Sequence, residues 1–305
     1  MLRLALAIVL LAASAQARTL SVGPGQEYRT PSAAAAVAQD GDRVEIQPGR
    51  YHDCATWRAS RLEIEGVGLA SGVVIGGKVC GWKAVFVTAG DAITVRNLTL
   101  TRASTPWGNG AGIRGEGRDL VVDRVRFVQN ENGILSGTAG GAMHVRESYF
   151  EGNGRCLQAC AHGLYVGHLD LLVVEHSEFL HTREGHHIKS RARRTEVLDC
   201  TIRDGATGTA SYDIEAPNGG ALLVRGTKIE KGPKTQNRST AISIGAEGVN
   251  NPSGEIVIEH NRFRNDSPEP SAFVTNLTGA EAVLKDNVLE GRVVPLRGKG
   301  EVQPE

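Results

Sequence analysis

Apolar residues recur in a fixed pattern along most of the chain. From residue 93 onward, segments such as ITVRNLTL, LVVDRVRF and LVVEHSEF carry one apolar residue followed five positions later by another. The first residues of these pairs are Val95, Val122, Val145, Val174, Val197, Val224, Ile258 and Leu284. The second residues are Leu100, Phe127, Phe150, Phe179, Ile202, Ile229, Phe263 and Leu289. Successive pairs lie 23 to 34 residues apart, as from Val122 to Val145 and from Val224 to Ile258, and this spacing is typical of a solenoid.

A second apolar position recurs in short segments between these repeats. Its members are Ile113, Ile134, Leu164, Ile188, Ile214 and Ile244. Because alternate residues of a strand point to opposite faces, we expect each of these side chains to point inward and its neighbours outward. The pattern predicts an all-β, single-domain, right-handed parallel β-helix over residues 18–305. The clearest coils fall in 93–290, and 291–305 is expected to be a C-terminal tail.

The N-terminal part of this domain carries a different signal. The alanine-rich segment 30–41, with Pro31 near its start and Gly41 at its end, predicts a short helix that caps the first coil. The following segment GDRVEIQPGRY, residues 41–51, resembles the leading coil of the pectate-lyase-like right-handed β-helix superfamily. The resemblance implies the same solenoid fold for the whole mature chain.

The first seventeen residues have the composition of a signal peptide. A basic start, an apolar run of about ten residues and the small residues of Ala15-Gln-Ala17 match the three regions of such a peptide. The apolar run is shorter than the roughly 20 residues that a membrane span needs, so we expect no membrane insertion. The sequence therefore predicts a secreted or periplasmic protein.

Charge and cysteine content narrow the function further. With 34 basic and 34 acidic residues the net charge is zero, which argues against a nucleic-acid partner. The five cysteines of an exported chain make disulfides plausible. We expect Cys54 to pair with Cys80 and Cys156 with Cys160. Cys200 then stays free, and it falls in a column of small residues expected in the interior.

Candidate chemistry is concentrated around the segment 184–191, EGHHIKSR, which holds two imidazoles, an ammonium and a guanidinium. Strands in neighbouring coils lie about 4.8 Å apart, so equivalent residues become neighbours. Three outward rows are expected: Tyr165, Lys189 and Glu215; Gly163, His187 and Asp213; and His162, His186 and Tyr212. Arg191, Asn218 and Glu247 are expected near the rim of the same face. Such a face forms a shallow groove suited to an extended polymer.

The residues Glu184, Ile188, Lys189 and Ser190 are similar to one coil of the chondroitinase B and alginate lyase family. That resemblance implies that Lys189 is the base that removes the proton next to a uronate carboxylate. The family places an arginine about one coil later. Here the corresponding coil holds Asp213 and Glu215, and neither Arg191 nor Arg225 matches the family motif.

The chemistry of β-elimination assigns roles in a slightly different way. The reaction requires a cation on the carboxylate, a base, and a proton donor for the leaving oxygen. Because Asp213 and Glu215 would raise the pKa of an adjacent lysine, we expect Lys189 to bind the carboxylate. His187 or Tyr165 would transfer the proton. His162, His186, Arg191, Tyr212, Glu247 and Asn218 are expected to bind substrate.

Other interpretations stay open at this point. A hydrolase would use Asp213 and Glu215 as its carboxylate pair, and a metal site would use His162, His186 and Asp213. Lys189 and Glu215 alone would be a surface ion pair worth less than about 1 kcal/mol.

The sequence favours a monomeric lyase acting on an acidic polysaccharide, with no required cofactor and with Ca²⁺ as one option. A C5-epimerase and a non-catalytic carbohydrate-binding or envelope protein are the alternatives.

Overall fold

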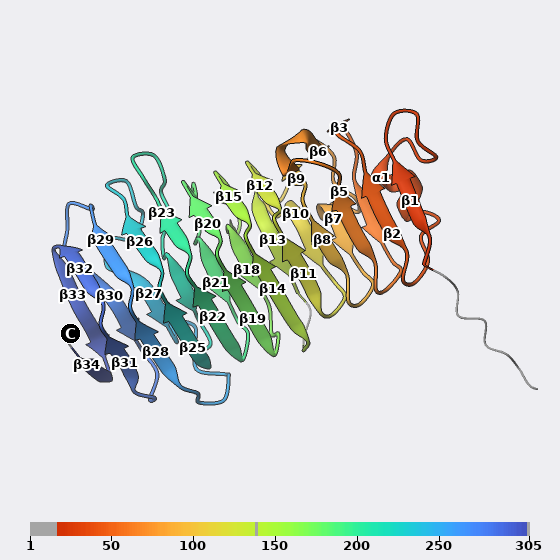
Figure 1. Ribbon diagram of the computed structural model, residues 1–305. Helices are drawn as coiled ribbons and strands as arrows, with labels where there is room; N and C mark the ends of the chain where they lie inside the picture. Colours follow the sequence, from red (N-terminus) through yellow and green to blue (C-terminus); the bar gives the residue numbers. More distant parts are fainter. Residues whose placement is uncertain (1–16, 138–139, 304–305) are drawn as a thin grey trace, which may run out of the picture.

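The computed structural model describes residues 17–137 and 140–303 and shows a parallel β-solenoid. Three long sheets run from the end that carries α1 and β1 to the end that carries β33 and β34 (Figure 1). Within each sheet, neighbouring strands come from successive coils and pair in parallel. The predicted all-β parallel β-helix is confirmed.

The strands of each sheet follow the chain in regular order. Sheet A consists of β1 (Thr19–Val22), β2 (Arg43–Ile46), β5 (Glu63–Gly66), β8 (Thr94–Arg96), β11 (Leu120–Asp123), β14 (Ala142–Arg146), β19 (Leu171–Glu175), β22 (Arg194–Leu198), β25 (Ala221–Arg225), β28 (Ile256–Glu259), β31 (Ala282–Lys285) and β34 (Gly300–Gln303). Sheet B consists of β3 (Gly49–Tyr51), β6 (Val73–Gly76), β9 (Thr99–Thr101), β12 (Arg126–Val128), β15 (Tyr149–Glu151), β20 (Glu178–Leu180), β23 (Thr201–Arg203), β26 (Lys228–Lys231), β29 (Arg262–Asn265) and β32 (Val288–Gly291). Sheet C consists of β4 (Ala55–Trp57), β7 (Ala84–Thr88), β10 (Ala111–Gly115), β13 (Asn132–Ser136), β18 (Leu164–Val166), β21 (Ile188–Ser190), β24 (Ile214–Ala216), β27 (Thr240–Ile244), β30 (Ser271–Asn276) and β33 (Val293–Gly298). A short hairpin, β16 (Arg155–Cys156) and β17 (Cys160–Ala161), precedes β18.

The interior is formed by the two predicted apolar columns and by ladders of like side chains. Phe127, Phe150 and Phe179 stack in sequence, with ring centroids 4.6 and 4.3 Å apart. At the corner between sheets A and B, the backbone N–H of Ser148 donates to the hydroxyl of Ser177 at 3.0 Å. Such side chains bind backbone N–H and C=O groups at the corner that have no partner in a neighbouring strand. The chain can therefore turn there inside an apolar core.

The two ends of the solenoid differ from the expected boundaries. The capping helix α1 covers only Pro31–Ala35, and the Thr30 side chain accepts the N–H of Ala33 in its first turn. The segment expected to be a C-terminal tail instead continues the coils as β33 and β34, as far as Gln303. The predicted signal peptide, 1–17, lies outside the described residues except for Ala17.

Both predicted disulfides are present. Cys54 and Cys80 are bonded with their Cα atoms 5.5 Å apart, and Cys156 and Cys160 close the β16–β17 hairpin. Cys200 is free and buried, and burial raises the pKa of its thiol to about 12. The thiol therefore acts as an interior side chain, as expected, because the thiolate that would react is suppressed.

Within the part of the chain that the structure describes, no helix has the length and apolar character needed to cross a membrane.

Candidate functional site

The row that carries the predicted chemistry forms on the outer face of sheet C. Tyr165 in β18 pairs with Lys189 in β21, which pairs with Glu215 in β24. The three side chains lie on consecutive coils and leave the sheet on the side opposite to Leu164, Ile188 and Ile214, which are fully buried. This alignment confirms the predicted row.

Two cations of this face share one carboxylate. The Nζ atom of Lys189 lies 2.5 Å from Oε1 of Glu247 and 3.0 Å from Oε2 of Glu215. The guanidinium of Arg191 contacts the second oxygen of Glu247 and donates from Nε to the hydroxyl of Tyr165 at 2.9 Å. Glu247 stands on the turn after β27 with 41% of its side chain exposed, whereas Lys189 keeps only 9% exposed. The two cations therefore form a carboxylate-binding pair at the rim of the face.

The charges of the two glutamates are fixed by this arrangement. Burial alone would raise the pKa of Glu247, but hydrogen bonds from Lys189 and Arg191 outweigh it and hold the pKa below its ordinary value. Burial opposes ionisation of Glu215 as well, and contacts with His186 and Lys189 lower its pKa in the same way. Both glutamates are ionised at neutral pH, so each is a weak base there.

Beside this row the predicted column of rings forms a ladder. The backbone N–H of His186 donates to Nδ1 of His162 at 3.0 Å, and the N–H of Tyr212 donates to Nδ1 of His186 at 3.1 Å. The rings of the two histidines stack with centroids 4.7 Å apart, and Tyr212 lies 5.0 Å beyond His186. Because each Nδ1 accepts a hydrogen bond, each neutral imidazole carries its proton on Nε2. Nε2 of His186 points to Glu215 at 3.1 Å, so these histidines present donors rather than bases.

The ladder predicts a measurable pH effect on stability. Burial lowers the pKa of His162 well below 6.5, and the nearby His186 and Lys189 lower it further. Below pH 6.5 the unfolded chain then binds more protons than the folded protein, so stability falls as the pH falls.

Asn132 fills the equivalent position one coil earlier and accepts the N–H of His162 at 2.8 Å. His162→Asn should therefore keep the ladder and lose less in melting temperature than the wild type between pH 7 and pH 5. An unchanged slope would show that His162 does not titrate in this way.

His187 and Asp213 do not point outward as predicted. Both are fully buried, because β21 begins at Ile188 and β24 at Ile214, so the residue before each strand lies at a corner where alternation does not apply. A Cβ atom built at Gly133, the equivalent position two coils earlier, would lie 2.7 Å from Phe150 in the interior. The corner position thus faces the core. His187 cannot reach a polymer, and Asp213 cannot form a hydrolytic pair with the outward Glu215.

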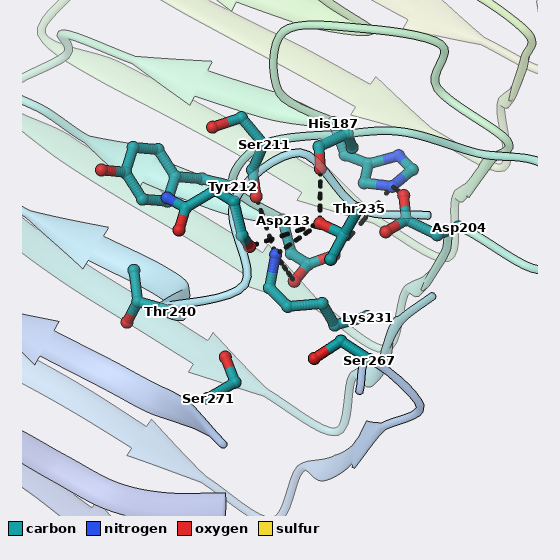
Figure 2. A network of polar contacts seen from close by, with 12 residues as sticks. His187, Asp204, Ser211, Tyr212, Asp213, Lys231, Thr235, Thr240, Ser267 and Ser271 are labelled. Atoms are coloured by element: carbon teal, nitrogen blue, oxygen red, sulfur yellow. Dashed lines mark hydrogen bonds and ion pairs between the residues drawn. The ribbon is translucent and has the colours of Figure 1, made fainter. Parts of the chain in front are cut away.

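The two buried residues belong to an interior polar cluster instead (Figure 2). Nε2 of His187 lies 3.0 Å from Oδ1 of Asp204, and Nζ of Lys231 lies 3.6 Å from Oδ2 of Asp213. Lys231 also donates to the hydroxyl of Thr235 at 3.2 Å. Burial raises the pKa of Asp213 to about 6 despite the opposing ammonium of Lys231. The cluster is a buried charge network beneath the loops that connect the strands of sheet B to those of sheet C. The ring of Tyr212 lies away from it in Figure 2.

Sequence reasoning missed Lys231 and Asp204, although a signal existed for both. Lys231 follows the inward Ile229 by two residues, and Asp204 follows the inward Ile202 by two. The period-two rule for strands places both on the interior face. Applying that rule to the last residue of β26 and to the residue after β23 would have found them.

Two further expectations change in detail. Asn218 is buried and accepts a hydrogen bond from Nη1 of Arg191 at 2.7 Å, so it orients the guanidinium and cannot contact substrate. The metal set His162, His186 and Asp213 does not assemble, because the histidines use Nδ1 for the ladder and Asp213 points inward.

Among the described residues, His187, Asp204 and Asp213 have donor atoms within 4.8 Å of one another. The ammonium of Lys231 beside them already supplies the positive charge of that cluster.

Comparison with known proteins identifies the architecture. No protein-family model matches the chain, and no curated protein matches it in sequence. The crystal structure of pectate lyase Pel9A matches with a TM-score of 0.70 and 14% identity, over 93% of this chain and 78% of that chain. Alginate lyase from Paenibacillus sp. str. FPU-7 matches with a TM-score of 0.59 and 15% identity, over 94% of this chain and 98% of that one. At these identities the likeness establishes the fold alone, a pectate-lyase-like parallel β-helix.

Proposed function

We propose that this protein is an exported enzyme that cleaves an acidic, uronate-containing polysaccharide by β-elimination. One observation carries the proposal: Lys189 and Arg191 together hold the carboxylate of Glu247 at the open rim of sheet C. A uronate carboxylate offers the same two oxygens in the same geometry. The fold adds support, because its structural neighbours include a pectate lyase and an alginate lyase.

The proposed reaction divides among the outward residues. Lys189 and Arg191 neutralise the uronate carboxylate, which makes the adjacent C–H more acidic and stabilises the charge that develops there. The Tyr165 oxygen takes that proton while its own O–H proton passes to the leaving oxygen, so the carbon–oxygen bond breaks, a carbon–carbon double bond forms and Tyr165 ends the step neutral. Nε of Arg191 donates to the same oxygen at 2.9 Å and orients the hydroxyl toward the substrate. We assign proton transfer to Tyr165 because His187, the other candidate, is buried.

The outward residues do not fit a calcium site. Ca²⁺ takes six to eight oxygen ligands, whereas the carboxylates of Glu215 and Glu247 each contact the ammonium of Lys189. The charge that Ca²⁺ would supply on this face is supplied by the chain itself. We therefore expect activity to be unchanged by a metal chelator.

Export is part of the proposal. The Cys54–Cys80 and Cys156–Cys160 disulfides are of the kind that persists in oxidising compartments. The composition of residues 1–17 points the same way. Secretion with loss of the first residues, measured by mass spectrometry of the exported protein, tests this part separately.

Incubation with alginate, pectate, glucuronan and glycosaminoglycans tests the reaction. Absorbance of the unsaturated uronate product should rise with at least one of them. Inversion at C5 without that absorbance would identify an epimerase. Binding to a polymer with neither change would identify a non-catalytic protein.

Glu247 is expected to compete with substrate for the two cations. Glu247→Gln removes the internal carboxylate, so the KM for the acidic polymer should fall about two- to fivefold, the scale of a partly exposed ion pair. Glu255→Gln is the matched control, because Glu255 is exposed on the loop before β28, away from sheet C. A rise in KM or a loss of kcat for Glu247→Gln would show that Glu247 itself binds substrate.

A further inference from the structure

Two exposed tryptophans meet on turns that lead into sheet C. The rings of Trp82 and Trp107 pack edge to face with centroids 6.0 Å apart, and 63% and 53% of these residues are exposed. The third tryptophan, Trp57, is fully buried. Two large rings in contact with each other and open to solvent are typical of a binding surface.

The tryptophans lie on the same edge of sheet C as the histidine ladder. Trp82 precedes β7 and Trp107 precedes β10, just as His162 precedes β18 and His186 precedes β21. Only β13 separates β10 from β18, so Trp107 stands about 10 Å along the solenoid from the coil of Tyr165. A polymer that lies along the outer face of sheet C, from the Lys189 coil toward β10 and β7, would reach both rings.

Leu157 bridges the two regions. A Cβ atom at Gly108 would lie 2.9 Å from Cδ1 of Leu157, so this side chain packs against the turn that carries Trp107. Leu157 sits in the hairpin closed by the Cys156–Cys160 disulfide, directly before His162. Half of Leu157 is exposed. Leu157 therefore adds exposed apolar surface between the turn of Trp107 and the hairpin that leads to His162.

A buried carboxylate fixes the turn of Trp107. Glu131 is only 3% exposed and accepts the backbone N–H groups of Thr105 at 2.9 Å and of Gly110 at 2.7 Å. These donors bracket Trp107 on both sides. Glu131 also pairs with Arg155 of β16 at 2.9 Å, so this carboxylate ties the turn of Trp107 to the neighbouring hairpin and holds the exposed ring in a fixed position, as a preformed binding site requires.

The turn of Trp82 is fixed in a different way. Cys80 is bonded to Cys54, and its backbone N–H donates to the carbonyl of Ala84 at 2.8 Å. The N–H of Lys83 donates back to the carbonyl of Cys80 at 3.0 Å. Trp82 thus stands at the tip of a cross-linked turn and loses little conformational entropy when a ligand binds.

We propose that Trp82 and Trp107 form a distal subsite that stacks against the pyranose rings of the same acidic polysaccharide. The identity of the polymer rests on the proposed function, whereas the stacking does not. The C–H faces of a sugar ring are apolar and pack on aromatic rings, while its carboxylate is bound by the cations several sugar units away. The subsite makes affinity depend on chain length.

Tryptophan fluorescence tests the subsite without turnover. Oligouronates of increasing length are titrated into Tyr165→Phe, which is expected to bind them with little change in affinity and to cleave them much more slowly. Oligomers long enough to span both regions should change the emission, and a disaccharide should not. Trp107→Ala in the same background should raise the Kd of the long oligomers about tenfold and leave that of the disaccharide unchanged. Leu69→Ala, a control at another exposed apolar residue, should change neither.

The outcomes separate this inference from the proposed function. Cleavage or binding of a uronate polymer with no change in emission, or an unchanged Kd in Trp107→Ala, overturns the subsite and leaves the reaction standing. A change in emission with a neutral polymer, together with no cleavage of any uronate, supports the stacking subsite and overturns the proposed reaction. No response to any polymer overturns both.

Discussion

Replacing Lys189 with alanine is expected to lower kcat/KM on the uronate polymer by about 10³-fold. Lys189 is held in place by Glu215 at 3.0 Å and only 9% of its side chain is exposed, so we expect no neighbouring cation to move into its position in the alanine variant. With the ammonium gone, Arg191 alone faces the charge that develops on the substrate carboxylate. Initial rates from product absorbance measure the effect.

Controls separate the roles of the residues in this row. Lys228→Ala removes an exposed lysine from sheet B and should leave the rate unchanged.

Lys189→Arg keeps the positive charge and should retain most of the substrate affinity. A loss of activity as complete as that of Lys189→Ala would instead identify Lys189 as the base implied by the lyase-family resemblance. Tyr165→Phe should lower kcat with little change in binding. Full activity in Lys189→Ala would remove this residue from the mechanism.

Replacing Lys231 with methionine is expected to destabilise the fold by about 3–5 kcal/mol. Lys231 is fully buried, and its ammonium lies 3.6 Å from Asp213 and donates to the carbonyl of Ser211 at 2.7 Å. Methionine fills similar volume but leaves the carboxylate of Asp213 in the interior without its ammonium partner. Denaturant unfolding at neutral pH, read by circular dichroism, measures the loss.

Adding Asp213→Asn to Lys231→Met should recover much of that stability, because one buried charge is removed together with its partner. The pair should be coupled by about 0.5–3 kcal/mol in a double-mutant cycle.

Asp213→Asn alone should also remove a pH dependence of the folding stability. The raised pKa of about 6 means that the folded protein takes up a proton between pH 6 and the ordinary 3.8, which stabilises it as the pH falls. Strictly additive single effects would show that the two groups do not interact.

The solenoid and the charged row could be predicted because both depend on period-two alternation within strands. Val122, Phe127 and Ile188 are each followed or preceded by equivalent residues on neighbouring coils, so one rule fixes their direction. Lys189 and Glu215 inherit their outward position from the inward Ile188 and Ile214. Register between coils then follows from aligning these apolar residues.

The features that could not be predicted from the sequence lie mainly where the strands end. His187 and Asp213 stand one residue before a strand, at a corner where the side chain turns into the core. The pairing of distant residues could not be predicted either, since Lys231 at the end of β26 meets Asp213, just before β24, across two neighbouring coils. Glu247 lies 58 residues after Lys189 and 56 residues after Arg191 in the sequence, and no local pattern encodes their contact.

Calorimetric titration with two forms of one oligosaccharide tests most directly whether Lys189 and Arg191 bind a uronate carboxylate. The Tyr165→Phe protein should bind the oligouronate, and adding Lys189→Ala should abolish most of that affinity. The same oligosaccharide with its carboxylates reduced to alcohols should bind weakly to both proteins. Equal affinity for the acidic and the reduced sugar would contradict a carboxylate site on this face.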